Sequence, residues 1–243
     1  MSRIQILSIG VDPVTMDQAV QRCLGFMEED RPHLVVTPNA EFAWLAAHEP
    51  DVAAIANRAD LAIPDGAGVV LAAKILGTPV PEKVAGVDLT LNLLKALSDR
   101  KRGSVYLLGA RPEVVAEAAR RIQERFPGVT VAGYHDGYWT PQEEPQIIQA
   151  IAAAAPDLLL VALGVPKQER WLAAHIHRLQ ARVCIGVGGT IDVIAGAAAR
   201  APEWMIKANL EWAFRIVKFG RYSRSLPPLV KFMLAVLGRR LRG

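Results

Sequence analysis

The chain has 243 residues, enough for one large domain or two small ones. Hydrophobic residues make up 51% of it and charged residues 21%, a balance that excludes a disordered protein and predicts a well-formed core. The net charge of +4 is uneven, because residues 200–243 hold ten Lys and Arg against two Glu, a net of +8, while residues 1–199 carry −4. The basic segment predicts an anionic partner: phosphate, nucleic acid or an anionic membrane surface.

Short apolar runs alternate with helical patterns over the first 190 residues or so. We predict strands at residues 4–9, 33–37, 61–64, 104–108, 130–134, 158–163 and 183–187. We predict helices at residues 17–28, 40–47, 50–57, 68–76, 89–100, 112–125, 141–154 and 169–179. This alternation predicts an α/β, Rossmann-like core over residues 1–199, with a mostly parallel sheet covered by helices.

The pattern changes in residues 200–243, which we treat as a second, basic and amphipathic segment. Residues 203–219 form a helical pattern that carries aromatic residues, among them Trp204, Trp212 and Phe214, and residues 229–237 are apolar except for Lys231. A short apolar helix beside basic residues is typical of a segment that lies on a membrane surface without crossing it. A C-terminal helix packed on the core, with a solvated basic end, explains the pattern about equally well.

Cysteine content and the N-terminus bear on the cellular compartment. Cys23 and Cys184 lie in apolar surroundings far apart in sequence and are expected to be buried free thiols. The first residues lack the apolar region of a signal peptide, and no apolar run reaches the ~18 residues of a spanning helix. We therefore expect a cytoplasmic protein.

Three polar clusters follow predicted strands. They contain Thr37 and Asn39, then Asp65 between Pro64 and Gly66, then the pair Gln168-Glu169. In open α/β sheets, ligands bind outside the carboxyl ends of the strands, so these clusters indicate a binding or catalytic site. The carboxylate of Asp65 is a suitable general base.

Two glycine-rich stretches also follow strands, at residues 108–112 around Gly109 and at residues 186–192. Neither matches a dinucleotide fingerprint or a P-loop. Each could hold a phosphate or nucleotide on backbone N–H groups, or could be a tight structural turn. The chain has no Asp-x-Asp motif and no His pair at metal-ligand spacing, so we expect neither a metal nor a cofactor.

Glycosyl transfer from a nucleotide sugar fits this combination. The acceptor hydroxyl must lose a proton to a base, and the departing diphosphate needs a metal ion or a cationic side chain. Asp65 is available as the base. Available cations are Lys83, Arg215, Arg221 and Arg224.

The order and spacing of these motifs resemble the WecG/TagA/CpsF glycosyltransferase family over nearly the whole chain. The matching pieces are Thr37-x-Asn39, Asp65-Gly66-x-Gly68, Val84-x-Gly86-x-Asp88, Gly164-x-Pro166-Lys167-Gln168-Glu169, Gly186-x-Gly188-Gly189-Thr190-x-Asp192, Arg200-Ala201-Pro202-x-Trp204 and Leu210-Glu211-Trp212-x-x-Arg215. The family usually has Arg at the position of Lys83. Lysine keeps the positive charge at this position but lacks the planar fork of the arginine side chain.

The resemblance implies an inverting, metal-independent transferase at the inner face of the cell membrane. The implied donor is UDP-N-acetylmannosamine, and the implied acceptor is GlcNAc-diphosphate-polyprenol, in teichoic acid or other cell-surface polysaccharide synthesis. The UDP-sugar is a substrate and not a cofactor, and no nucleic-acid partner is implied. Homo-oligomerisation is left open.

The resemblance also assigns residue roles. It implies that Asp65 is the base and that Thr37, Asn39 and Gln168 line the pocket near the sugar and acceptor. It implies uridine-side positions at Tyr138 and Asp192, and we expect Gly109 and Glu169 to contact substrate as well. The tail arginines, Arg215, Arg221 and Arg224, are implied to meet the diphosphates.

Two alternatives remain open from the sequence. The first is a transferase of the same family that uses UDP-glucose or UDP-glucuronate in exopolysaccharide synthesis. The second is a non-catalytic protein that binds a nucleotide and recruits partners to a membrane. A carboxylate in a Pro-Asp-Gly turn, as at Asp65, favours an enzyme.

Overall fold

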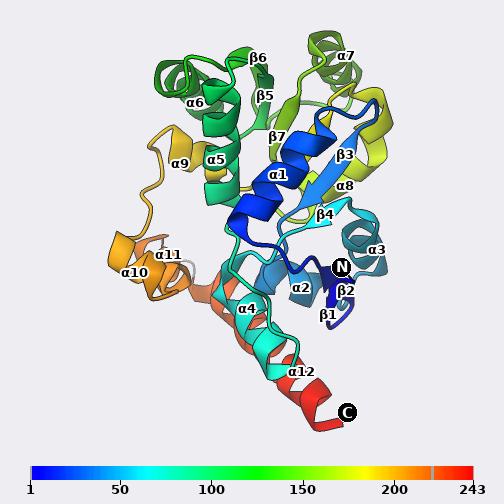
Figure 1. The fold of residues 1–243 in the computed structure, drawn as a ribbon, viewed down its shortest axis with the longest axis vertical. Coiled ribbons are helices and arrows are strands. Elements are labelled where there is room, and N and C mark those ends of the chain that lie inside the picture. The colour runs from blue at the N-terminus through cyan, green and yellow to red at the C-terminus, as the bar shows by residue number, and fades with distance from the viewer. Residues whose placement is uncertain (1, 220–221, 243) are drawn as a thin grey trace. The chain divides into compact units, whose positions relative to one another are not determined.

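The computed structural model describes residues 2–219 and 222–242, which form two compact units (Figure 1). Unit 1 comprises Met1–Asp17, Thr37–Ala85 and Arg200–Gly243. Unit 2 comprises Gln18–Val36 and Gly86–Ala199. The chain therefore passes from one unit to the other four times, and unit 1 is built from three separate stretches of sequence.

Unit 2 is built on parallel strands. Their spatial order is β3 (His33–Val36), β8 (Val183–Gly186), β7 (Leu158–Ala162), β5 (Ser104–Gly109) and β6 (Thr130–His135), and each neighbouring pair is parallel. All four residues of β3 and of β8 are buried, as expected of strands that helices cover on both faces. The predicted α/β, Rossmann-like fold with a mostly parallel sheet is confirmed.

Helices cover these strands. They are α1 (Met16–Phe26), most of which lies in unit 2, α5 (Gly86–Asp99), α6 (Pro112–Arg125), α7 (Glu144–Ala154), α8 (Lys167–His175), the 3-10 turn η1 (Ile176–Arg178) and α9 (Thr190–Ile194). Helix α6 packs on β5 and β6, and α8 packs on β3 and β8. Helix α6 begins at Pro112, where the missing N–H of proline costs no helical bond, and it ends where the sequence predicts.

Unit 1 is mostly helical. Its elements are β1 (Ile4–Ile6), β2 (Ile9–Val11), α2 (Ala40–Ala46), α3 (Pro50–Arg58), β4 (Leu61–Ala62), α4 (Gly66–Ile75), α10 (Glu203–Lys207), α11 (Glu211–Phe219) and α12 (Tyr222–Arg242). Helix α12, red in Figure 1, packs against α2 and α4. Phe232 and Val236 of α12 are fully buried, so this helix belongs to the core of unit 1.

The predicted single strand at residues 4–9 is wrong. Leu7 adopts a left-handed backbone conformation with φ +55°, and the chain reverses there into an antiparallel hairpin. Ile6 pairs with Ile9, and Ile4 pairs with Val11. The apolar run looked continuous because both strands of the hairpin are apolar and the turn between them contains only Leu7 and Ser8.

The tail also differs from its predicted pattern. The helix predicted at residues 203–219 is two helices, α10 and α11, separated near Asn209, whose φ of +59° ends the first. Asparagine tolerates this conformation better than most residues. The last helix is longer than the apolar run at residues 229–237. Helix α12 already includes Pro227 and Pro228, and it continues to Arg242.

Candidate active site

In unit 1, two backbone hydrogen bonds hold Asp65 between two other predicted segments. The N–H of Asp65 donates to the carbonyl of Pro38 at 3.1 Å, and the carbonyl of Pro64 accepts from the N–H of Val84 at 3.1 Å. Pro38 lies between Thr37 and Asn39, and Val84 follows Lys83. Three segments that are distant in sequence therefore meet at the Asp65 turn.

The turn at Asp65 leads directly into helix α4. Asp65 is the N-cap residue of α4, with an extended backbone and a half-buried side chain. Gly66 follows with φ +80°, a conformation that glycine adopts without strain. A Cβ atom on Gly66 would lie 3.8 Å from the Cβ of Asn39, so the Asn39 side chain lies beside the turn.

Asn39 caps the neighbouring helix. Its side-chain oxygen accepts a hydrogen bond of 3.0 Å from the N–H of Phe42 in the first turn of α2. This bond satisfies a donor that the helix itself leaves unpaired. Helices α2 and α4 thus both begin directly after predicted site residues, Asn39 and Asp65.

Lys83 is half-buried and points toward the tail segment of unit 1. Its ammonium group donates to the carbonyl of Ile206 at 3.4 Å. Ile206 lies in the last turn of α10, where carbonyl groups carry partial negative charge. The structure therefore joins Lys83 to the helix that follows residue 200.

In unit 2, the side chain of Gln168 links two loops. Its Oε1 atom accepts from the N–H of Gly164 at 3.2 Å and from the N–H of Gly188 at 3.1 Å. Its Nε2 atom donates to Oε1 of Glu169 at 2.8 Å. Gln168 is 1% exposed, so the contacts that the structure shows for it are with the protein's own loops.

Glu169 is a buried carboxyl. It is 1% exposed, and its Oε2 atom has no hydrogen-bond partner among the residues that the structure describes. Burial raises the pKa of Glu169 to about 7, although the hydrogen bond from Gln168 acts in the opposite direction. A Cβ on Gly186 would lie 2.8 Å from Nε2 of Gln168 and 3.0 Å from Oε1 of Glu169, so only glycine leaves room for this pair.

Two predicted substrate contacts in unit 2, Gly109 and Tyr138, lie at the end of strand β5 and in the loop after strand β6. Gly109 ends β5 with φ +118°, and a Cβ there would lie 2.4 Å from the carbonyl oxygen of Ala162. The next residue, Ala110, accepts from the N–H of Gly137 at 2.8 Å, directly before Tyr138. Tyr138 is 70% exposed.

Asp192 lies in the short helix α9 and is half-buried. It lies four residues after Gly188, the loop residue that Gln168 holds. The contacts of Gln168 and Gly109 thus give these loops a defined backbone arrangement. Contact with a nucleotide remains a prediction for Gly109, Tyr138, Gln168, Glu169 and Asp192.

The predicted tail arginines fall largely outside the described part of the structure. Arg221 lies outside it altogether, and so do the side chains of Arg215 in α11 and Arg224 in α12. Within residues 2–219 and 222–242, no group of three or more His, Cys, Asp or Glu residues could hold a metal ion. Neither described cysteine is in a disulfide bond, and burial raises the pKa of both thiols to about 12.

An ion pair between Arg3 and Asp12 in unit 1 was not predicted from the sequence. Arg3 Nε lies 3.2 Å from Asp12 Oδ2, and only 7% of the Asp12 side chain is exposed. The sequence signal for this contact was a pair of opposite charges within an apolar N-terminal run. Such pairs of charges are too common to indicate a site.

Comparison with known protein families identifies the chain as a glycosyltransferase. The family model described as "Glycosyl transferase WecG/TagA/CpsF family" matches residues 4–243, and the chain belongs to this family. The resemblance seen in the sequence is therefore confirmed.

Several curated relatives share one name, N-acetylglucosaminyldiphosphoundecaprenol N-acetyl-beta-D-mannosaminyltransferase. The chain is 36% identical to the one from Bacillus spizizenii over 212 residues, covering 87% of this chain and 81% of the relative. It is 34% identical to the one from Bacillus subtilis over 205 residues, covering 84% and 78%. It is 31% identical to the one from Staphylococcus aureus strain NCTC 8325 over 245 residues, covering 99% and 95%.

Proposed function

We propose that this chain transfers N-acetylmannosamine from UDP-N-acetylmannosamine to GlcNAc-diphosphate-undecaprenol, with inversion at the anomeric carbon. The observation that carries the proposal is the family match from residue 4 to residue 243, together with relatives whose names state the transferred sugar and the acceptor. The Asp65 turn supports it, because it presents a carboxylate at the start of a helix in the first of the two units.

Asp65 acts as the general base in this proposal. Its carboxylate accepts the proton of an acceptor hydroxyl on GlcNAc while that oxygen forms a bond to C1 of the donor sugar. The bond between C1 and the phosphate oxygen breaks, and UDP leaves with the electron pair. Thr37 and Asn39 lie on the segment that is hydrogen-bonded to Asp65, so they are available to orient the sugar or the acceptor.

Negative charge grows on the departing UDP, and cationic side chains stabilise it. Lys83 is a candidate for this role, because its loop is joined to the Asp65 turn by the hydrogen bond between Val84 and Pro64. Arg215, Arg221 and Arg224 supply further positive charge from the tail. No divalent ion takes part in this scheme.

For the nucleotide part of the donor, the proposed contacts are those that the family resemblance implies. The N–H groups and side chains near Gly109, Tyr138, Gln168, Glu169 and Asp192 provide the polar contacts for uridine and phosphate. Gln168 supports this assignment because it fixes the Gly164 and Gly188 loops in one arrangement.

The exposed residues of helix α12 support the proposal that the enzyme acts at a membrane surface. Helix α12 has exposed apolar residues at spacings of three and four, which places them on one side of the helix: Leu226, Val230, Leu234, Leu237 and Leu241. Leu234 is 63% exposed and Leu241 is 87% exposed, while Phe232 and Val236 face the core. Lys231, Arg239 and Arg240 are exposed on the same helix.

An apolar stripe beside basic residues suits a peripheral contact with an anionic lipid surface. Among the described residues, no helix has the length and apolar character needed to cross a membrane. In this proposal the enzyme works at the inner face of the cell membrane, where it meets the lipid-linked acceptor.

The test is a UDP-release assay with a soluble GlcNAc-diphosphate-lipid as acceptor. UDP-N-acetylmannosamine, UDP-glucose and UDP-glucuronate are compared as donors, and omission of the acceptor is the control. We expect release with UDP-N-acetylmannosamine that depends on the acceptor and forms a disaccharide-diphosphate-lipid. Preference for another donor would replace the proposed sugar, and the absence of turnover with every donor would favour a binding protein.

A further inference from the structure

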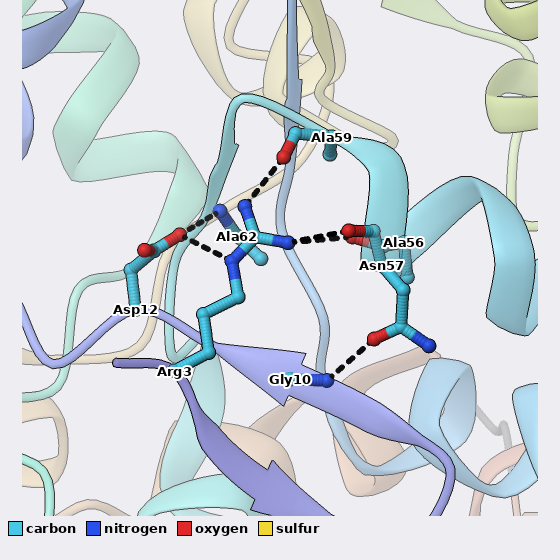
Figure 2. Close-up of polar contacts among 7 residues, drawn as sticks. All are labelled: Arg3, Gly10, Asp12, Ala56, Asn57, Ala59 and Ala62. Carbon is cyan, nitrogen blue, oxygen red and sulfur yellow. Dashed lines mark hydrogen bonds and ion pairs between the residues drawn. The ribbon is translucent and has the colours of Figure 1, made fainter. Parts of the chain in front are cut away.

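The residues before Asp65 are held by a polar network that the proposed mechanism does not use. At its centre is Asp12, which follows strand β2 and bonds to both backbone groups of Ala62 in β4. Figure 2 shows the bond from the Ala62 N–H to the Asp12 carboxylate. The side-chain Oδ2 atom of Asp12 accepts from the N–H of Ala62 at 2.7 Å, and the N–H of Asp12 donates to the carbonyl of Ala62 at 2.8 Å. Ala62 is therefore fixed from both sides.

Arg3 connects Asp12 to the end of helix α3. Its Nε atom donates to Asp12 Oδ2 at 3.2 Å, and Nη1 donates to the carbonyls of Ala56 at 3.2 Å and Asn57 at 3.0 Å. Its Nη2 atom donates to the carbonyl of Ala59. One guanidinium group thus binds a carboxylate and three backbone carbonyls, as Figure 2 shows. The planar fork of arginine permits this, whereas a lysine ammonium group has no such fixed geometry.

A second link reinforces the same junction. The side-chain oxygen of Asn57 accepts from the N–H of Gly10 at 2.8 Å, and its amide donates to the carbonyl of Ser8 at 2.9 Å. The hairpin of β1 and β2 is therefore joined to the end of α3 by Asn57 and by Arg3. The segment between α3 and β4 is the one that leads to Asp65.

Little freedom remains between Ala62 and Asp65. The two intervening residues, Ile63 and Pro64, are buried, and the ring of Pro64 restricts its own backbone. The carbonyl of Pro64 and the N–H of Asp65 are both hydrogen-bonded, as described above. A shift of Ala62 would therefore be transmitted to the Asp65 carboxylate.

We propose that Arg3 and Asp12 form a positioning pair that sets the location of the Asp65 carboxylate relative to the acceptor hydroxyl. This inference rests on the proposed role of Asp65 as the base. The pair binds no substrate in this scheme. It fixes the strand from which the base projects, and a displacement of about 1 Å at a reacting group can cost on the order of 10²-fold in rate.

The experiment measures kcat and KM for wild type, Arg3→Lys, Asp12→Asn and Asp65→Asn, well below each variant's melting temperature. Val52→Ala is the matched control, because Val52 is fully buried in α3 and lies outside the Arg3 network. We expect Arg3→Lys and Asp12→Asn to lower kcat about 10- to 100-fold with KM for the donor changed less than about threefold. Val52→Ala should lower the melting temperature and leave kcat near the wild-type value.

A double variant separates positioning from general destabilisation. If Arg3 acts through Asp65, the loss caused by Arg3→Lys is already included in the loss caused by Asp65→Asn. Adding Arg3→Lys to Asp65→Asn should then lower the residual kcat by less than about twofold. Full multiplication of the two losses would overturn the inference, and so would normal kcat in both Arg3→Lys and Asp12→Asn while Asp65→Asn is impaired. Normal turnover by Asp65→Asn would refute the base assignment itself and the positioning pair with it.

Discussion

The N–H of Asp65 and the carbonyl of Pro38 are joined by a hydrogen bond of 3.1 Å. This bond connects two motifs that are 27 positions apart and that follow different strands, β3 and β4. Because Pro38 lies between Thr37 and Asn39, the bond places both of these residues on the segment next to the proposed base. The arrangement makes Asp65 the first residue to test.

Asp65→Asn keeps the shape of the side chain and removes its basicity. We expect turnover to fall by roughly 10²–10⁴-fold, since the acceptor hydroxyl would lose its proton acceptor. The melting temperature and the affinity for UDP should stay close to those of wild type. Steady-state kinetics and UDP titration check this, and near-normal turnover would rule Asp65 out as the base.

The reaction should proceed without a divalent metal ion. Positive side chains take the place of the ion in the proposed scheme, so turnover should persist in excess EDTA. Addition of Mg²⁺ or Mn²⁺ after EDTA should change the rate little. Loss of activity in EDTA with recovery on adding metal would show that an ion stabilises the leaving diphosphate.

Lys83 should contribute positive charge at the site. We expect Lys83→Ala to lower turnover and Lys83→Arg to retain or improve it, because both Lys and Arg can supply the charge. Lys74→Ala is a matched control, because Lys74 is an exposed lysine in α4 of the same unit. If both alanine variants behave like wild type, the hydrogen bond from Lys83 to Ile206 is only a structural contact.

The apolar stripe on α12 should bind lipid independently of catalysis. The double variant Val230→Ser and Leu234→Ser should reduce binding to liposomes that contain anionic lipid, while turnover on a soluble acceptor stays near wild type. Each basic residue near an anionic surface contributes about 1 kcal/mol, so wild-type binding should weaken with added salt but not vanish.

Deletion of the tail is a poorer test of lipid binding. It would remove Phe232 and Val236, which are fully buried against the rest of unit 1, and would destabilise the protein. Unchanged liposome binding by the double serine variant would contradict membrane docking by this stripe. A smaller mass of the variant in solution would show instead that the stripe joins two copies of the chain.

Glu169 should make stability depend on pH. Its pKa rises from the usual 4.5 to about 7 in the folded protein, so the folded chain holds more protons than the unfolded chain between these values. The free energy of unfolding should therefore fall as pH rises from about 4.5 to about 7. Glu169→Gln imitates the protonated form and should flatten this dependence. Urea unfolding of both proteins from pH 5 to 8 measures it, and identical slopes would contradict the shift.

Much of the fold could be predicted from strand–helix alternation. The strands from residue 33 onward and the helices up to residue 179 lie where their patterns place them, with ends that differ by a few residues. The hairpin turn at Leu7 could not be predicted, because its left-handed conformation occurs at a residue that rarely adopts it. The break at Asn209 and the length of α12 depend on packing within unit 1, which local patterns do not encode.

Part of the candidate site was also predictable, because some of its residues come directly after predicted strands. Asp65, Thr37 and Asn39 each follow a buried strand, so the sequence alone indicated that their two segments lie at the same edge of the sheet, and a hydrogen bond joins them there. The way Gln168 holds Gly164 and Gly188 was not predictable, since its hydrogen bonds depend on the backbone of two loops. The contact between Arg3 and the end of α3 joins residues more than 50 positions apart and leaves no local pattern.

The burial of Phe232 and Val236 has a consequence for the order of events during synthesis. Unit 2 is complete once residue 199 has been made, whereas unit 1 also needs helix α12. A nascent chain must extend beyond Val236 before α2 and α4, the helices that begin at Asn39 and Asp65, are fully covered. A chain that stops between these points would therefore contain every residue of unit 2 but not all of unit 1, and the helices next to the proposed base would lack the cover of α12.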